Sequence, residues 1–210
     1  MPWTPAELAA RLASEMPDGW IVNLGVGMPT LVAAHLAGRQ ILVHAENGVL
    51  GVGPPPPPDR QDPDVIDPGK NPVTILPGAS FMDSAVSFGL IRGGRLDLAV
   101  MGAYQVSQDG DRANWRLPDR RGGAIGGAAD LAAGAQRVWV MTSHLTKEGT
   151  PKLVKRCTYP LTAPRVVTRI YTDMAVLEVA SAGFRALALA PGVSFDDLRA
   201  ATAAPIEIAA

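Results

Sequence analysis

The most reactive candidate in the chain is one carboxylate at the end of an apolar stretch. Residues 41–45 read Ile-Leu-Val-His-Ala, and Glu46, Asn47 and Gly48 follow directly. In open parallel sheets, ligands bind beyond the carboxyl ends of the strands, so a glutamate placed there faces the expected crevice. The alternative is an Asn-Gly turn on which Glu46 is only a solvated surface charge.

Glycines follow this carboxylate at short intervals. Gly48, Gly51 and Gly53 remove side chains over six residues. This lets a bulky substrate approach the backbone and leaves amide groups free as donors.

Two more glycine clusters could contribute to a site. Residues 122–127 precede an alanine-rich stretch that carries Asp130, and backbone amides at a helix N-terminus can stabilise a developing oxyanion. Residues 23–29, with Gly25 and Gly27, close an apolar strand in the same way. The alternatives are a flexible loop for the first cluster and a simple tight turn for the second.

Several common motifs are absent from the sequence. Residues 25–30 fail the third position of GxGxxG, and there is no Walker A, GxSxG or HExxH motif. The three histidines, at positions 35, 44 and 144, are too scattered to indicate a metal site. The single cysteine, Cys157, excludes cysteine-based zinc sites, so we expect no metal.

The length and net charge of the chain limit its number of domains and its classes of partner. With 210 residues and 22.0 kDa, the chain is expected to form one domain over residues 1–210. A net charge of −1 and a pI near 6.3 argue against a nucleic acid partner.

Hydropathy points to a soluble protein with a partner. The chain is 47% apolar, only 19% charged and has a mean hydropathy of +0.12, yet no apolar run approaches the roughly 20 residues of a membrane span. These polar side chains are too few to cover the surface of a monomer. We therefore expect a permanent partner subunit. The first residues lack a signal peptide pattern, which predicts a cytoplasmic location.

The apolar pattern predicts an α/β fold with a largely parallel sheet flanked by helices. Thr4, Pro5 and Glu7 form a capping-box pattern before a first helix. Short continuous apolar runs indicate strands covered on both faces. The apolar runs lie at residues 21–24, 41–45, 73–76, 96–101 and 138–141. Between them, helix signals lie at residues 29–36, 80–83 and 127–135.

The C-terminal third differs from the rest. Runs at 165–171, 175–179 and 186–189 are closely spaced, which predicts mixed or antiparallel strands before a short helix opened by Ser194. Five prolines at 54–58 predict an extended polyproline segment.

Read in order, these segments resemble the B subunit of family I CoA-transferases, the group of 3-oxoacid and 3-oxoadipate CoA-transferases. The motifs that carry the resemblance cover nearly the whole chain. They are N-L-G-V-G-M-P at 23–29, E-N-G-V-L-G-V-G-P at 46–54, L-P-G-A-S at 76–80, I-R-G-G at 91–94, G-A-Y-Q-V at 102–106, A-N-W at 113–115, G-G-A at 126–128 and T-Y-P-L-T at 158–162.

The resemblance implies roles for individual residues. Glu46 corresponds to the family's catalytic glutamate, although Ala45 stands where the family pattern has serine. Gly127 corresponds to a residue whose amide contributes to the oxyanion hole, while the other donor is a glutamine of the A half. The resemblance also implies a substrate- or CoA-binding role for five residues: Gly25, Gly27, Asn47, Gly48 and Gly126.

The resemblance further implies a covalent mechanism with coenzyme A as substrate and no separate cofactor. Glu46 would form a glutamyl-CoA thioester, moving CoA from succinyl-CoA or acetoacetyl-CoA to a carboxylate. The expected partner is an A subunit, in an A2B2 assembly. A 3-oxoadipate CoA-transferase B subunit and an acyl-CoA thioester hydrolase on the same scaffold are alternatives. A non-catalytic subunit and a relative of the sugar-phosphate isomerases are also open.

Overall fold

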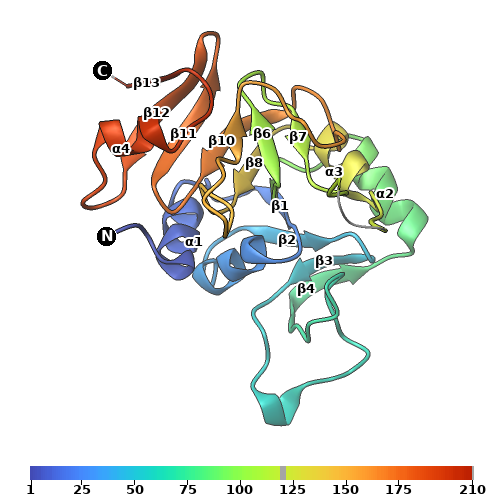
Figure 1. Cartoon of the computed structure of the whole chain (residues 1–210). Coiled ribbons are helices and arrows are strands. Elements are labelled where there is room, and N and C mark those ends of the chain that lie inside the picture. The colour runs from blue at the N-terminus through green and yellow to red at the C-terminus, as the bar shows by residue number, and fades with distance from the viewer. Residues whose placement is uncertain (119–121, 210) are drawn as a thin grey trace.

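The computed structural model describes residues 1–118 and 122–209, and its centre is a ten-stranded sheet (Figure 1). A second sheet of three short strands lies beside it. The strands of the main sheet, in spatial order, are β13 (Ile206–Ile208), β12 (Gly183–Leu189), β11 (Ala175–Ala180), β10 (Val167–Tyr171), β8 (Val138–Met141), β5 (Leu98–Met101), β1 (Ile21–Leu24), β2 (Leu42–Ala45), β3 (Val49–Val52) and β4 (Ile75–Phe81). The small sheet has the order β7 (Arg112–Ala113), β6 (Gln105–Ser107) and β9 (Leu153–Val154).

The middle of the main sheet is parallel, as the apolar runs predict. Strands β10, β8, β5, β1 and β2 all run in the same direction. Every residue of β5 and β8 is buried, as expected for strands covered on both faces. Beyond β10 the chain continues through antiparallel β11 and β12. The α/β class and the mixed C-terminal strands are confirmed.

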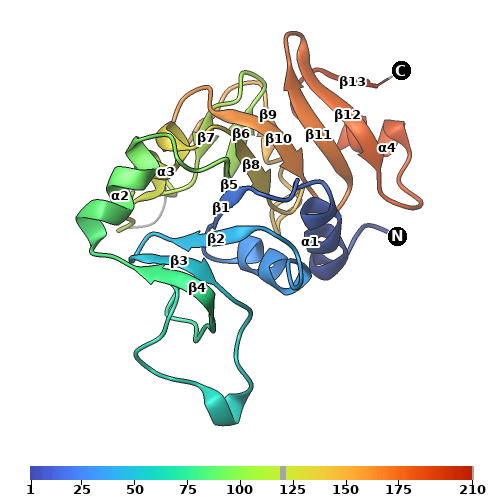
Figure 2. The same cartoon turned by 180° about the vertical axis from the view of Figure 1, so that it is seen from behind.

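Helices cover both faces of the sheet (Figures 1 and 2). Alternate side chains of a strand point to opposite faces, so Leu98 and Val100 join one core, and Ala99 and Met101 join the other. The first core contains α1 (Pro5–Ser14) and the 3₁₀ helix η1 (Met28–His35). The second contains α2 (Ser84–Arg92), α3 (Ala128–Gly134) and α4 (Phe195–Ala200). In residues 1–118 and 122–209, no helix has the length and apolarity to cross a membrane.

Local signals explain where these helices begin. The Thr4 hydroxyl accepts a hydrogen bond from the Glu7 amide, and the Glu7 carboxylate accepts one from the Thr4 amide, which completes the predicted capping box of α1. Asp83 caps α2 by accepting from the Val86 amide at 2.9 Å.

The edge of the sheet formed by β4 differs from the sequence-based expectation. The apolar run at residues 73–76 predicts a strand covered on both faces, but β4 spans Ile75–Phe81 and most of its residues are exposed. It pairs antiparallel with β3 and forms the edge of the sheet. Phe81 is 68% exposed. A short apolar run cannot by itself distinguish a buried strand from an edge strand.

The segment between β3 and β4 forms an arm that projects away from the sheet (Figure 1). The proline run opens this arm. Pro57 has extended backbone angles of −60° and 154°, but Pro58 begins the short 3₁₀ helix η2 (Pro58–Arg60). The polyproline prediction is therefore only partly correct.

His144 predicts a loss of stability in acid. Its ring nitrogens lie 3.0 Å from the hydroxyls of Thr172 and Thr202, and burial lowers the pKa of His144 to about 4, against a smaller opposing effect of Asp173. The unfolded chain binds this proton more tightly, with an ordinary pKa of 6.5. Stability is therefore full above pH 6.5 and falls toward pH 4, by about 3 kcal/mol for this group.

The measurement is the free energy of unfolding between pH 7.5 and 4.5. Replacing His144 by Gln should make this dependence shallower. Parallel curves for the wild type and His144→Gln would contradict the assignment.

Candidate active site

Glu46 occupies a tight hairpin turn at the end of β2. Residues Glu46, Asn47 and Gly48 join β2 to the antiparallel β3, and the Gly48 amide donates to Ala45 at 3.0 Å. Gly48 has a φ of 118°, which favours glycine. The alternative of an Asn-Gly turn is thus correct for the backbone. The side chain of Glu46 is nevertheless half-buried, not a solvated charge.

A cavity of about 270 Å³ opens at the carboxyl ends of the parallel strands. Its lining includes Leu24 and Gly25 at the end of β1, Glu46 after β2, and Met101 and Gly102 at the end of β5. This is the place where open α/β sheets bind ligands. The expectation that Glu46 faces such a crevice is confirmed.

Glu46 lies against Gly127, the N-cap residue of α3. A methyl group added to Gly127 would overlap the Oε2 atom of Glu46 and lie 2.9 Å from Cζ of Phe88. Gly127 therefore leaves the space that the carboxylate occupies. Residues 46 and 127 are far apart in sequence, so the fold brings together the two residues singled out as nucleophile and oxyanion donor.

Burial and charge both perturb Glu46. Desolvation raises the pKa of the Glu46 carboxyl, and the negative charge of Asp130 raises it further. Asp130 lies in α3 and accepts from Arg92 Nε at 2.7 Å, on the neighbouring helix α2. A carboxylate deprived of water holds its electron pair in a more basic, more nucleophilic form than a solvated one.

A chain of buried polar groups holds the backbone of the turn. Asn23 Nδ2 lies 3.3 Å from His44 Nδ1, and His44 Nε2 lies 3.0 Å from the Ser87 hydroxyl. Ser87 donates to the carbonyl of Glu46 at 2.9 Å. Because the Ser87 hydrogen is used there, Nε2 of His44 must be the protonated nitrogen. Burial lowers the pKa of His44 to about 4, which keeps the ring neutral.

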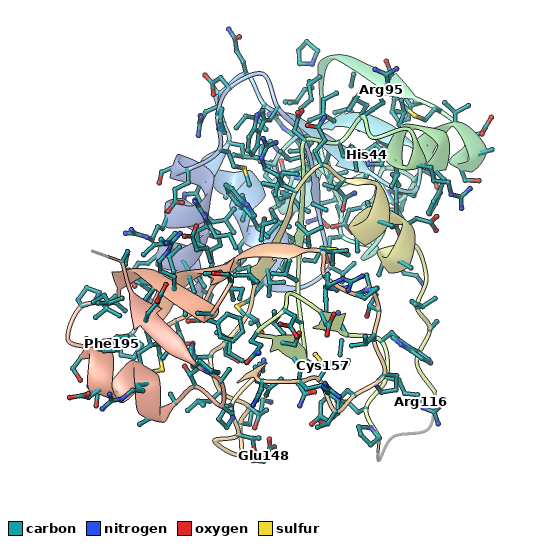
Figure 3. The ribbon with its side chains drawn as sticks, turned by 90° about the horizontal axis from the view of Figure 1, so that it is seen from above. His44, Arg95, Arg116, Glu148, Cys157 and Phe195 are labelled. Carbon is teal, nitrogen blue, oxygen red and sulfur yellow. The ribbon has the colours of Figure 1, made fainter. Side chains whose placement is uncertain are left out.

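Figure 3 shows His44 inside the molecule, near α2. Sequence inspection singled out neither His44 nor Ser87 for this role. A histidine in an apolar strand and a serine in a helix give no pattern that links them, because the contact depends on how α2 packs.

The other predicted site residues divide into two groups. Gly25 and Gly126 line the cavity beside Glu46 and Gly127. Asn47 turns away and donates to the carbonyl of Ile66 in the arm at 2.8 Å. Gly27 and Gly48 are not among the described residues that line the cavity. Their binding role stays a prediction.

Gly48, Gly51 and Gly53 allow neighbouring segments to pack closely against β3. A Cβ on Gly48 would overlap the carbonyl oxygen of Met82, and one on Gly51 would lie 2.8 Å from Ala79 Cβ. A Cβ on Gly53 would overlap the Thr74 hydroxyl. These glycines admit β4 and the arm close to β3, and their expected role in letting a substrate approach the backbone stays a prediction.

Two polar residues at the cavity are absent from the sequence-based site. Arg112 and Asn114 both line it, from strand β7 and the residue after it. Their spacing of two puts both side chains on the same face of the strand. Within the described residues, no group of three His, Cys, Asp or Glu side chains is arranged to hold a metal ion.

Comparison with known families decides the class of the protein. A family model described as Coenzyme A transferase matches residues 6–201. The chain belongs to the coenzyme A transferase family. The B subunit of the 3-oxoadipate CoA-transferase of Pseudomonas putida is 49% identical over 201 residues, which cover 95% of this chain and 94% of the relative. The B subunit of the succinyl-CoA:3-ketoacid coenzyme A transferase of Helicobacter pylori is 44% identical over 198 residues, covering 94% and 96%.

Solved structures confirm the fold. An acyl-CoA transferase (YdiF) of Escherichia coli O157:H7, in a thioester complex with CoA, matches with a TM-score of 0.76 at 19% identity; the match covers all of this chain but only 42% of that one. Glutaconate coenzyme A-transferase of Acidaminococcus fermentans matches with a TM-score of 0.71 at 18% identity, covering 98% and 86%. A variant of the decarboxylase AibA/AibB also matches, with a TM-score of 0.70 at 23% identity over 98% of this chain and 86% of that one, so this fold alone does not assign the reaction.

The Asp130–Arg92 pair predicts opposite shifts of the Glu46 pKa. Asp130→Asn removes a negative charge near Glu46 and leaves Arg92 unpaired, so the pKa of Glu46 should fall. Arg92→Gln leaves Asp130 unneutralised, so the pKa should rise. Both are measured by NMR titration of carbon-13-labelled glutamate side chains. The distant Glu7 carboxyl is the internal control, and shifts of the same sign in the two variants would contradict the assignment.

Proposed function

We propose that this chain is the B subunit of a 3-oxoacid CoA-transferase, in which Glu46 is the nucleophile that carries CoA between two carboxylic acids. The observation that carries the proposal is the half-buried Glu46 carboxylate, packed against Gly127 in a cavity at the carboxyl ends of β1, β2 and β5. The sequence relatives, which cover nearly all of the chain, support the reaction class.

The first half of the reaction follows from what a carboxylate does to a thioester. An oxygen of Glu46 attacks the acyl carbon of the donor, the carbon–sulfur bond breaks, and CoA leaves as a thiolate. The product on the enzyme is a mixed anhydride. The thiolate then attacks the Glu46 carbonyl carbon of that anhydride, which releases the donor acid as a carboxylate and leaves a glutamyl-CoA thioester.

The second half runs the same steps backwards with the acceptor carboxylate. Negative charge develops on the carbonyl oxygen at each addition step, and we assign the amide of Gly127 as one donor to that oxygen. The energy of the acyl bond passes from one acid to the other through Glu46. These steps therefore require coenzyme A as substrate and no further cofactor.

A partner A subunit would complete and close this site. Val26 and Ile125 line the cavity and expose apolar surface, with Val26 64% exposed. Apolar surface at the mouth of a cavity suits a subunit contact. Exclusion of water there protects the anhydride and the thioester from hydrolysis. An A2B2 assembly, as expected from the sequence, is part of this proposal.

The relatives indicate the chemical class of the CoA donor and of the acceptor acid, and not the individual compounds. Succinyl-CoA with a 3-oxoacid and succinyl-CoA with 3-oxoadipate both suit relatives of 44% and 49% identity. Both pairs share a dicarboxylic acyl donor.

The test is detection of the covalent intermediate on Glu46. The protein assembled with its A subunit is incubated with succinyl-CoA and no acceptor, and the peptide containing Glu46 is examined by mass spectrometry. A CoA thioester on Glu46 supports the proposal. Release of CoA without an adduct on this residue would overturn it and favour the thioester hydrolase.

Glu46→Gln should abolish adduct formation without weakening the fold. Glu46 has a raised pKa in the folded state, so its ionised form destabilises the fold at neutral pH. A neutral amide removes that cost. We expect loss of the adduct together with an equal or higher melting temperature. A lower melting temperature would contradict this expectation and would show that Glu46 stabilises the fold.

Gly127→Ala should displace the nucleophile. The added methyl group meets Glu46 and Phe88, and misplacement of a reacting group by about 1 Å costs about 100-fold in rate. The measurement is the rate of glutamyl-CoA formation. The matched control is Gly89→Ala in α2, where a methyl group meets nothing within 4 Å. Equal rates for Gly127→Ala and Gly89→Ala would contradict the assigned contact.

A further inference from the structure

Arg112 is a buried cation at the wall of the Glu46 cavity. Only 2% of its surface is exposed, and it lines the same cavity as Glu46. Its main chain is fixed on both sides, because its amide donates to Ala163 at 2.9 Å and its carbonyl accepts from Thr162 at 2.7 Å. The base of this side chain is therefore held on the wall of the cavity in which an acyl group would react.

The guanidinium is only partly used by the protein. Nε donates to the carbonyl of Gly102 at 2.8 Å. Nη1 is buried and has no hydrogen-bond partner among the described residues. A buried charged donor left unpaired is costly, and native proteins rarely keep one. Such a group at a ligand cavity indicates that the missing acceptor comes from outside the chain.

The charge of Arg112 persists at neutral pH. Burial lowers the pKa of Arg112 to about 10, which leaves the guanidinium protonated. Arg112 and Glu46 are the two charged residues among the described residues that line the cavity. One is the proposed nucleophile and the other is free to bind an anion.

A dicarboxylic acyl group brings a second negative charge into this cavity, whereas a monocarboxylic acyl group does not. Its remote carboxylate enters a half-buried space beside the ionised Glu46, and like charges repel strongly where water is scarce. A guanidinium on the wall offsets this repulsion and can bind a carboxylate through two parallel hydrogen bonds. Asn114, on the same face of the strand, adds a neutral polar group nearby.

We propose that Arg112 binds the remote carboxylate of a dicarboxylic acyl group and so selects dicarboxylic acyl-CoA donors over monocarboxylic ones. The inference rests on the proposed function, because it assumes that the acyl carbon reacts at Glu46. It assigns Arg112 a role in substrate binding and none in bond making or breaking.

The test compares two thioesters that differ in the remote group alone. Succinyl-CoA carries a carboxylate there, and 4-oxopentanoyl-CoA carries a methyl ketone of similar shape. The rate constant for glutamyl-CoA formation is measured for each, with the chain assembled with its A subunit. Since the reacting carbonyl is a neutral thioester in both, any effect of charge arises at the remote end.

The wild type should prefer succinyl-CoA. Arg112→Met should lower the rate constant for succinyl-CoA about 100-fold and leave that for 4-oxopentanoyl-CoA little changed, while Arg112→Lys should retain part of the preference. Arg39→Met is the matched control, because Arg39 donates to the carbonyls of Ala13 and Met16 and does not line the cavity. It should leave the preference unchanged.

Two results would overturn the inference alone. The first is that the wild type forms the adduct on Glu46 but shows no preference for succinyl-CoA. An equal loss for both thioesters in Arg112→Met, with an unchanged melting temperature, would be the other, since it would mean that Arg112 pairs with the partner subunit or orients the reacting group. Absence of any adduct on Glu46 in the wild type would instead overturn the proposed function and this inference with it.

Discussion

The burial of one carboxylate is the constraint on which this site depends. Glu46 lies at the end of β2 with its side chain against Gly127 and near Asp130. Water would stabilise the ionised group and make it less reactive. The fold instead withholds part of that hydration, and the stability of the parallel core offsets the cost. The absence of a side chain at residue 127 makes this arrangement sterically possible.

Positioning of the carboxylate depends on neutral groups. The link from Asn23 through His44 and Ser87 reaches the backbone of Glu46 without placing a charge there. A protonated histidine in this place would lower the pKa of the nearby carboxyl and oppose the effect of burial. A low pKa for His44 and a raised pKa for Glu46 thus have the same physical origin, which is exclusion of water from the interior between β2 and α2.

Much of the fold could be predicted from the sequence, and the site only in part. Buried parallel strands such as β5 and β8 leave continuous apolar runs, and the capping box at Thr4 is a local signal, so both are predicted correctly. The edge strand β4 is not, because its apolar residues resemble those of a buried strand. Glu46 follows a predicted strand directly, whereas Arg112 belongs to a strand of two residues that gives no periodic signal.

The tightness of the β2–β3 turn also limits how the family can vary in length. The turn is closed by the Gly48 amide, and β3 is held in register between β2 and β4. Inserting one residue there would reverse the faces of β3 or distort the turn that holds Glu46. The projecting arm between β3 and β4 carries no such register for most of its length (Figure 2). Insertions and deletions in natural relatives should therefore accumulate in the arm and spare the turn.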